Sequence, residues 1–170
     1  MKLHLGGTMQ KDGWLILNKI PSDDVDFVGD IRDLSQFNDN QFDEVYASHV
    51  LEHISHSEVM PTLAGIYRII KASGVFYVSV PDLNILSNCI SSPNVSLSEK
   101  YSAMTMIFGG QTNSFDYHMT GFNEEILSHF LKNVGFSDVK RVEEFGLFED
   151  GSVYRPFGFL ISLNIVARKE

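Results

Sequence analysis

The feature that most constrains the fold is a strand, a helix and a second strand in the middle of the chain. Phe42–Ala47 alternates apolar and polar residues, and Val75–Val80 is a second β-rich run that a proline stops. Between them, Val59–Ile70 carries apolar residues at helical spacing, and Ser57 is the predicted N-cap. Two strands joined through a helix are parallel neighbours with a right-handed crossover. This order predicts an α/β fold with a mostly parallel sheet.

Further elements are predicted on both sides of this unit. Asn123–Val134 has the apolar spacing of a helix and is followed by Gly135, a common residue just after a helix. The further predicted strands are Lys2–Leu5, Trp14–Leu17, Val25–Val28, Asp138–Glu143 and Leu160–Ala167. Only residues 6–13 separate the first two strands, whereas a helical crossover needs about a dozen residues or more. The first connection is therefore either a crossover without a helix or a hairpin.

The bulk properties predict one globular domain spanning residues 1–170. Hydrophobic residues make up 44% of the chain, and no apolar run approaches the roughly 20 residues of a membrane helix. The single cysteine, Cys89, cannot form an internal disulfide, which favours a cytoplasmic location. A net charge of −9 without a basic stripe argues against a nucleic-acid partner. We expect a small-molecule ligand instead.

Several short motifs follow one another in a characteristic order. They are the Gly-Asp-Ile-Arg-Asp-Leu turn in 26–34, Asp-Asn-Gln-Phe-Asp in 37–43, Val-Leu-Glu-His in 45–54, Tyr-Arg-Ile-Ile-Lys in 67–74 and the Pro-Asp pair at 81–82. Together they resemble the middle of the class I S-adenosyl-L-methionine (SAM)-dependent methyltransferases. With residues 109–122, the chain is similar to a compact, methyltransferase type 11-like subgroup. The resemblance implies a Rossmann-like, three-layer αβα fold with an antiparallel last strand, and it favours a first crossover that lacks its helix.

The resemblance also implies a SAM site at the carboxyl ends of the strands, where doubly wound sheets bind their ligands. Its members come from four strand ends or turns: Gly6 and Gly7 beside the methionine part, Asn18 at the ribose, Asp30 and Ile31 around the adenine, and Ser48 and His49 beside the sulfonium.

Two positions depart from the family pattern. Thr8 stands where a glycine is common, and Asn18 stands where an acidic residue usually binds the ribose hydroxyls. Asparagine still donates and accepts hydrogen bonds, but it lacks the charge that makes such bonds roughly twice as strong.

The acceptor side is predicted in the segment Asp116-Tyr117-His118, where the family places a lid. A histidine is the usual base near neutral pH, so His118 is the candidate base, with Asp116 or Tyr117 orienting it. The alternative is that His118 only fastens this loop. His49, His53 and His56 lack the spacing of a zinc motif, so no metal site is expected.

These features predict a SAM-dependent methyltransferase that acts on a small-molecule or glycan-type acceptor. The alternative function is a catalytically degenerate binding or scaffold module with the same fold. The aromatic segment Phe145–Phe159 is too long for a tight hairpin and is an acceptor-pocket flap, a homodimer contact or a packed loop.

Overall fold

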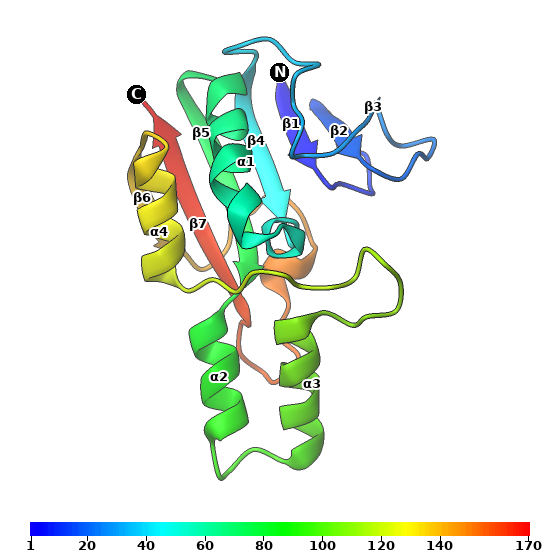
Figure 1. Cartoon of the computed structure of the whole chain (residues 1–170), viewed down its shortest axis with the longest axis vertical. Coiled ribbons are helices and arrows are strands. Elements are labelled where there is room, and N and C mark those ends of the chain that lie inside the picture. Colours follow the sequence, from blue (N-terminus) through cyan, green and yellow to red (C-terminus); the bar gives the residue numbers. More distant parts are fainter.

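The computed structural model describes residues 1–170 and contains a seven-stranded sheet with helices on one face and at one end (Figure 1). The strands are β1 (Lys2–Leu5), β2 (Trp14–Asn18), β3 (Phe27–Val28), β4 (Phe42–Ser48), β5 (Ile70–Pro81), β6 (Phe136–Val142) and β7 (Ser162–Lys169). The helices are α1 (His56–Ile69), α2 (Leu83–Ser91), α3 (Leu97–Phe108) and α4 (Glu124–Asn133), with 3-10 turns η1 (Leu51–His53) and η2 (Gly151–Val153).

The sheet has the strand order β3-β2-β1-β4-β5-β7-β6. The pairs from β3 to β5 are parallel, whereas β7 runs antiparallel to both β5 and β6. The predicted Rossmann-like sheet with an antiparallel last strand is therefore confirmed.

The first connection is a parallel crossover without a helix. β1 pairs with β2 in parallel, with Leu5 opposite Leu17, and residues 6–13 between them contain no helical turn. Gly6 and Gly13 both adopt positive φ, at 75° and 80°, and these glycines allow the chain to reverse within so few residues. Of the two alternatives, the structure shows the lost helix and not the hairpin.

Two predicted boundaries in the central unit are wrong. Helix α1 begins at His56, with Ser55 and not Ser57 as its N-cap residue. The Ser55 hydroxyl donates to the Glu58 carboxylate at 2.6 Å, which fixes the first turn earlier than the apolar periodicity suggests. Strand β5 begins at Ile70 and not at Val75, because residues 70–74 continue along β4 through an irregular register.

Helices α1 and α4 cover one face of the sheet (Figure 1). This face carries the main hydrophobic core, in which α1 contributes Leu63 and Ile66 and α4 contributes Leu127 and Leu131, all fully buried. Strand residues that point to this face, such as Val45 and Phe76, alternate with residues that point to the other face.

The opposite face is covered by a loop and not by a helix. The segment between β6 and β7, residues 143–161, lies over it and holds only the single turn η2. The Phe148 ring contacts the rings of His4, Trp14 and Tyr46, which project from β1, β2 and β4. Within the chain, the segment Phe145–Phe159 packs against the sheet, as the packed-loop interpretation predicts. The third layer of the predicted αβα arrangement is thus a loop.

Helices α2 and α3 form a hairpin that projects beyond the end of the sheet (Figure 1). Asp82 caps α2 by accepting from two backbone N–H groups, and its buried carboxylate also pairs with Arg141 at 2.7 Å. None of the helices combines the length and the apolar composition that crossing a membrane requires.

Candidate active site

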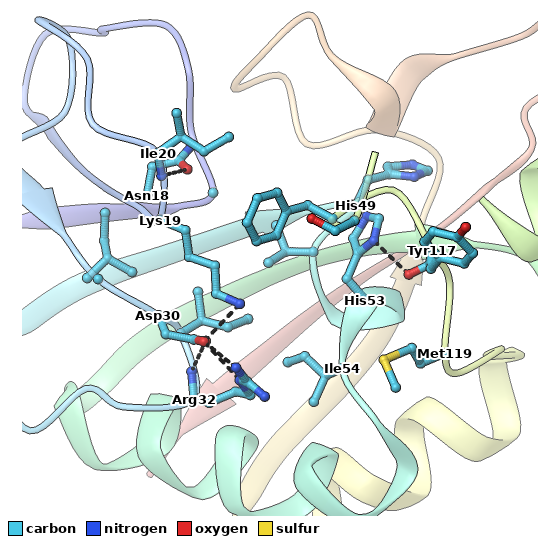
Figure 2. A pocket seen from close by; sticks show the side chains of 17 residues that line it. Asn18, Lys19, Ile20, Asp30, Arg32, His49, His53, Ile54, Tyr117 and Met119 are labelled. Carbon is cyan, nitrogen blue, oxygen red and sulfur yellow. Dashed lines mark hydrogen bonds and ion pairs between the residues drawn. The ribbon is translucent and has the colours of Figure 1, made fainter. Parts of the chain in front are cut away.

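A pocket of about 400 Å³ opens at the carboxyl ends of β1, β2 and β4 (Figure 2). Its volume lies within the range of small-molecule sites. Of the seven residues predicted to bind SAM, five line it: Gly6, Asn18, Asp30, Ile31 and His49. Gly7 and Ser48 instead line a smaller cavity of about 130 Å³, which shares Gly6 with the main pocket.

The end of β1 is shaped by two close approaches. A Cβ atom on Gly6 would lie 2.6 Å from a Val50 methyl, and φ at Gly6 is 75°. A Cβ atom on Gly7 would lie 2.7 Å from the His4 ring, so this glycine makes room for a β1 side chain. Gly6 therefore keeps the pocket wall open, while Gly7 supports the strand end behind it.

The Asn18 side chain links the ends of β1 and β2 by hydrogen bonds. Its Nδ2 donates to the Gly7 carbonyl at 2.9 Å, and its Oδ1 accepts from the Ile20 N–H at 3.0 Å. The donor and the acceptor group of the amide thus both bind backbone of the segments that follow β1 and β2, where the first crossover has no helix. This explains why an asparagine, with one donor and one acceptor group, stands at this position.

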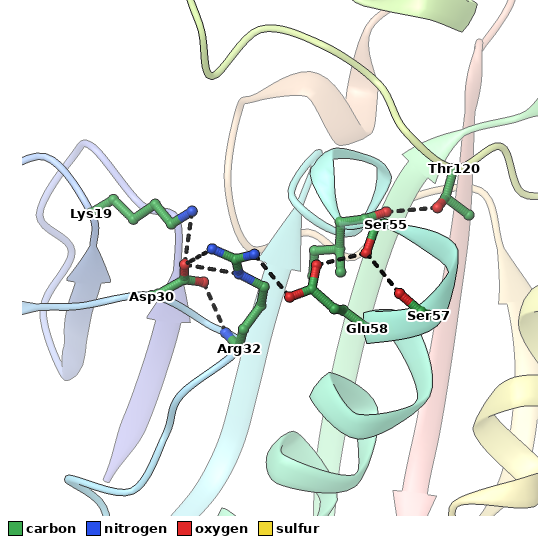
Figure 3. A network of polar contacts seen from close by, with 8 residues as sticks. Lys19, Asp30, Arg32, Ser55, Ser57, Glu58 and Thr120 are labelled. Carbon is green, nitrogen blue, oxygen red and sulfur yellow. Dashed lines mark hydrogen bonds and ion pairs between the residues drawn. The ribbon is translucent and has the colours of Figure 1, made fainter.

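Asp30 is the centre of a charged network along the pocket wall (Figure 3). Its carboxylate pairs with Lys19 at 2.8 Å and with Arg32 at 2.6 Å, and Arg32 also contacts Glu58 at 3.0 Å. Burial alone would raise the pKa of Asp30, but the hydrogen bonds from Arg32 and Lys19 hold it well below the usual range. Asp30 is therefore a carboxylate at any ordinary pH.

Ile31 offers the pocket a free backbone donor. Its side chain is buried, and its N–H donates to no group of the protein, whereas the next N–H, that of Arg32, donates to Asp30. Asp30 and Ile31 thus place an acceptor group and an unpartnered donor next to each other in the chain.

His49 lies at the end of β4 in a left-handed conformation with φ of 53°. Its Nε2 lies 2.9 Å from the Ser162 hydroxyl, and its Nδ1 lies 3.1 Å from a Glu52 oxygen. Burial lowers the pKa of His49, but Glu52 and Asp150 more than reverse that effect and raise it.

The three predicted catalytic residues separate in the structure. Tyr117 lines the main pocket, but the Asp116 carboxylate accepts from the Thr112 side chain at 2.7 Å within its own loop. His118 lies behind the pocket wall, where its Nδ1 bonds the Met106 carbonyl at 2.9 Å. This contact fastens the loop to α3, as the structural alternative requires. Burial lowers the pKa of His118, so its ring is neutral near pH 7.

Several pocket residues were not predicted. Lys19 and Arg32 directly follow the predicted Asn18 and Ile31, and this adjacency was the available signal for them. Phe115, Met119 and His53 also line the pocket. The Lys19 ammonium lies 5.9 Å from the centre of the Phe115 ring, so the segment before α4 reaches across the pocket toward β2.

Comparisons with known proteins agree with this architecture. Residues 12–78 match the family model described as a methyltransferase domain. No curated protein sequence matches the chain.

Solved structures with the same fold cover nearly the whole chain. A SAM-dependent methyltransferase from Archaeoglobus fulgidus is 18% identical with a TM-score of 0.62, over 99% of this chain and 85% of that one. The 1,6-didemethyltoxoflavin-N1-methyltransferase of Burkholderia thailandensis, with bound S-adenosylhomocysteine, is 19% identical with a TM-score of 0.63, over 99% and 70%. A Thermotoga maritima methyltransferase, a possible histamine N-methyltransferase, is 13% identical with a TM-score of 0.60, over 99% and 82%. The chain therefore has the fold of the class I SAM-dependent methyltransferases, the superfamily that its sequence resembles.

Proposed function

We propose that the chain is a SAM-dependent methyltransferase whose cofactor occupies the pocket between Gly6 and Asp30. The observation that carries the proposal is that two neighbouring residues of the pocket wall offer complementary groups. Asp30 carries a carboxylate, and the backbone N–H of Ile31 has no partner in the protein. The family resemblance implies an adenine-binding role for the same two groups. When bound, SAM would supply an electrophilic methyl group.

The protein's own contribution is chiefly positioning. Methyl transfer needs the attacking atom in line with the methyl group, and holding two reactants in such geometry supplies a large part of the rate. His53, Tyr117 and Met119 line the side of the pocket away from Asp30, and we assign this side to the acceptor. We expect a small-molecule or glycan-type acceptor.

For His118 we favour the structural role, because it lies behind the Tyr117 wall and does not line the pocket. Its Nδ1 bonds the Met106 carbonyl, which fastens the loop to α3. Asp116 organises the loop that carries it, and Tyr117 borders the acceptor space.

The test is calorimetric titration with SAM and with S-adenosylhomocysteine. We expect binding to the wild type and a loss of about tenfold or more in Asp30→Asn, since a bond to a charged group contributes roughly 1.5–3 kcal/mol. Asp33→Asn, in the exposed turn three residues later, is the matched control and should bind normally. Equal affinity of the two variants would place the adenine elsewhere.

A non-catalytic binding module remains the second candidate, favoured by two observations. The Asn18 amide is already engaged on both sides, and the Asp30 carboxylate is already paired with two cations. A ligand must therefore compete with protein contacts at both positions. Absence of heat and of a thermal shift at millimolar SAM would favour this second function over the first.

A further inference from the structure

Three metal-ligating side chains converge behind the acceptor side of the pocket. Glu52 and His53 belong to the turn η1, and His118 belongs to the segment between α3 and α4. One ligand atom from each lies within 4.8 Å of the others, and the His53 and His118 rings meet edge to face at 4.7 Å.

The Glu52 carboxylate is buried without a hydrogen bond. The residue is 1% exposed, and neither carboxylate oxygen accepts a hydrogen bond, although His49 Nδ1 lies 3.1 Å from one of them. Removing a carboxylate from water costs several kcal/mol, so buried charges in proteins are paired or coordinate metals. Its one cationic neighbour is His49, which is charged only when protonated, so a further cation would stabilise this carboxylate.

Both histidines are oriented as metal ligands usually are. His53 Nδ1 lies 3.1 Å from the Tyr117 carbonyl, and His118 Nδ1 lies 2.9 Å from the Met106 carbonyl. A carbonyl only accepts, so each Nδ1 carries the proton and each Nε2 keeps its lone pair. Ligating histidines typically donate their other N–H to a carbonyl or carboxylate in this way.

We propose that Glu52, His53 and His118 bind a divalent transition-metal ion of the Zn²⁺ type. Two imidazoles and one carboxylate suit such ions, whereas Mg²⁺ and Ca²⁺ prefer oxygen ligands alone. Metal–ligand bonds of about 2.0–2.2 Å require the three donors, which lie within 4.8 Å of one another, to approach by up to about 1.4 Å. Side-chain rotation of the half-buried His53 allows that movement.

Three protein ligands leave an open coordination position, as in catalytic zinc sites. His53 lines the main pocket, while Glu52 and His118 line a separate, smaller cavity. Sequence spacing alone did not predict this site. It pointed to His49, His53 and His56, but His56 is exposed at the start of α1, and the third ligand comes from His118, far along the chain.

The competing explanation is that His49, when protonated, neutralises Glu52 by itself. The two explanations differ in what His118 contributes, because His118 is a ligand in one and a bystander in the other. They are separated by titrating the untagged full chain with Zn²⁺ by calorimetry and with Co²⁺ by visible absorption.

We expect one ion per chain, with ligand-field bands from bound Co²⁺. We expect Glu52→Gln and His118→Gln each to weaken binding by about tenfold or more, the size of effect that even outer-shell changes produce at metal sites. His56→Gln, at an exposed histidine, is the matched control and should bind as the wild type does.

The readout is independent of methyl transfer, so a failed SAM titration would not affect it. Near-ultraviolet circular dichroism of each variant verifies folding. If Glu52→Gln does not fold, the metal affinity of His118→Gln decides between the two explanations. No stoichiometric binding to the wild type, or unchanged affinity in folded His118→Gln, would overturn the proposal.

Discussion

The two faces of the sheet are closed by different means. The face under α1 and α4 is closed by buried aliphatic and phenylalanine side chains, and Thr62 of α1 has the one buried polar side-chain atom there that lacks a partner. The face under residues 143–161 is closed by aromatic rings and polar groups. It contains four unpartnered polar atoms, on His4, Ser48, Ser79 and Asn164.

The difference teaches how a Rossmann-like sheet persists without helices on one face. Hydrogen bonds partly take the place of hydrophobic burial: Asn164 donates to the carbonyls of Glu143 and Ser152, both at 2.8 Å, and Tyr46 donates to Asp150. Such bonds contribute less than burial of aliphatic groups, and each unpartnered buried polar atom adds a cost. We expect the loop-covered face to open before the helix-covered face.

The largest effect is expected on the helix-covered face. Leu63→Ala removes a fully buried α1 side chain and should lower the free energy of unfolding by about 2–5 kcal/mol, as Leu→Ala changes in cores do. Urea unfolding followed by circular dichroism measures it. Ile126→Ala, at a side chain that is 39% exposed on α4, is the control and should change stability by less than about 0.5 kcal/mol.

The next effect is a pH dependence that belongs to the loop-covered face. Burial lowers the pKa of His4 from 6.5 to about 4, so the unfolded chain binds the proton more readily than the folded one. Stability contributed by neutral His4 is therefore present above pH 6.5 and is lost as the pH falls from 6.5 to about 4. The loss should reach about 2 kcal/mol at pH 5, since each pKa unit corresponds to about 1.4 kcal/mol.

Unfolding of wild type and His4→Leu at pH 7 and pH 5 isolates this contribution. We expect a steeper loss of stability in the wild type, because leucine does not titrate. Parallel behaviour of the two proteins would show that His4 is accessible to water.

A smaller effect is expected from Tyr46→Phe. The Tyr46 hydroxyl donates to both Asp150 oxygens, at 3.0 and 2.9 Å, and lies 3.1 Å from the Ser152 hydroxyl. Losing a bond to a charged acceptor should cost about 1.5 kcal/mol. Tyr154→Phe, in the same loop but 52% exposed, serves as the control in thermal unfolding. A neutral result for Tyr46→Phe would mean that water satisfies Asp150.

The smallest effect is expected from Phe148→Leu. This change loses the ring contacts to His4, Trp14 and Tyr46 but keeps most of the apolar volume. We therefore expect a total cost near the lower end of the range of about 0.5–1.5 kcal/mol that a single aromatic pair contributes. Hydrogen exchange is the better measurement, because we expect faster exchange confined to 143–161. Faster exchange in α1 as well would contradict independent opening of the two faces.

The sequence predicted the helix-covered face of the sheet and the pocket residues around Asp30. Strand and helix periodicity located the central unit, and the turn motif around Asp30 identified two residues that line the pocket, because both signals are local. The loop-covered face could not be predicted, since Tyr46 and Asp150 are far apart in sequence and meet only in the fold. The cluster of Glu52, His53 and His118 was not predicted for the same reason. The hydrogen bond from Asn18 to Gly7 could not be predicted either, because it forms only where β1 and β2 lie side by side.

The short connection between β1 and β2 also has a kinetic consequence. The entropy lost on closing a loop grows with its length, by about 0.6 kcal/mol for each doubling. With only residues 6–13 between them, β1 and β2 form a local parallel pair, whereas the pairing of β7 with β5 closes a loop of residues 82–161. Because chains rich in local contacts fold faster, we expect the helix-free crossover to bring the β1–β2 edge together early and leave the β5–β7 pairing to limit the folding rate.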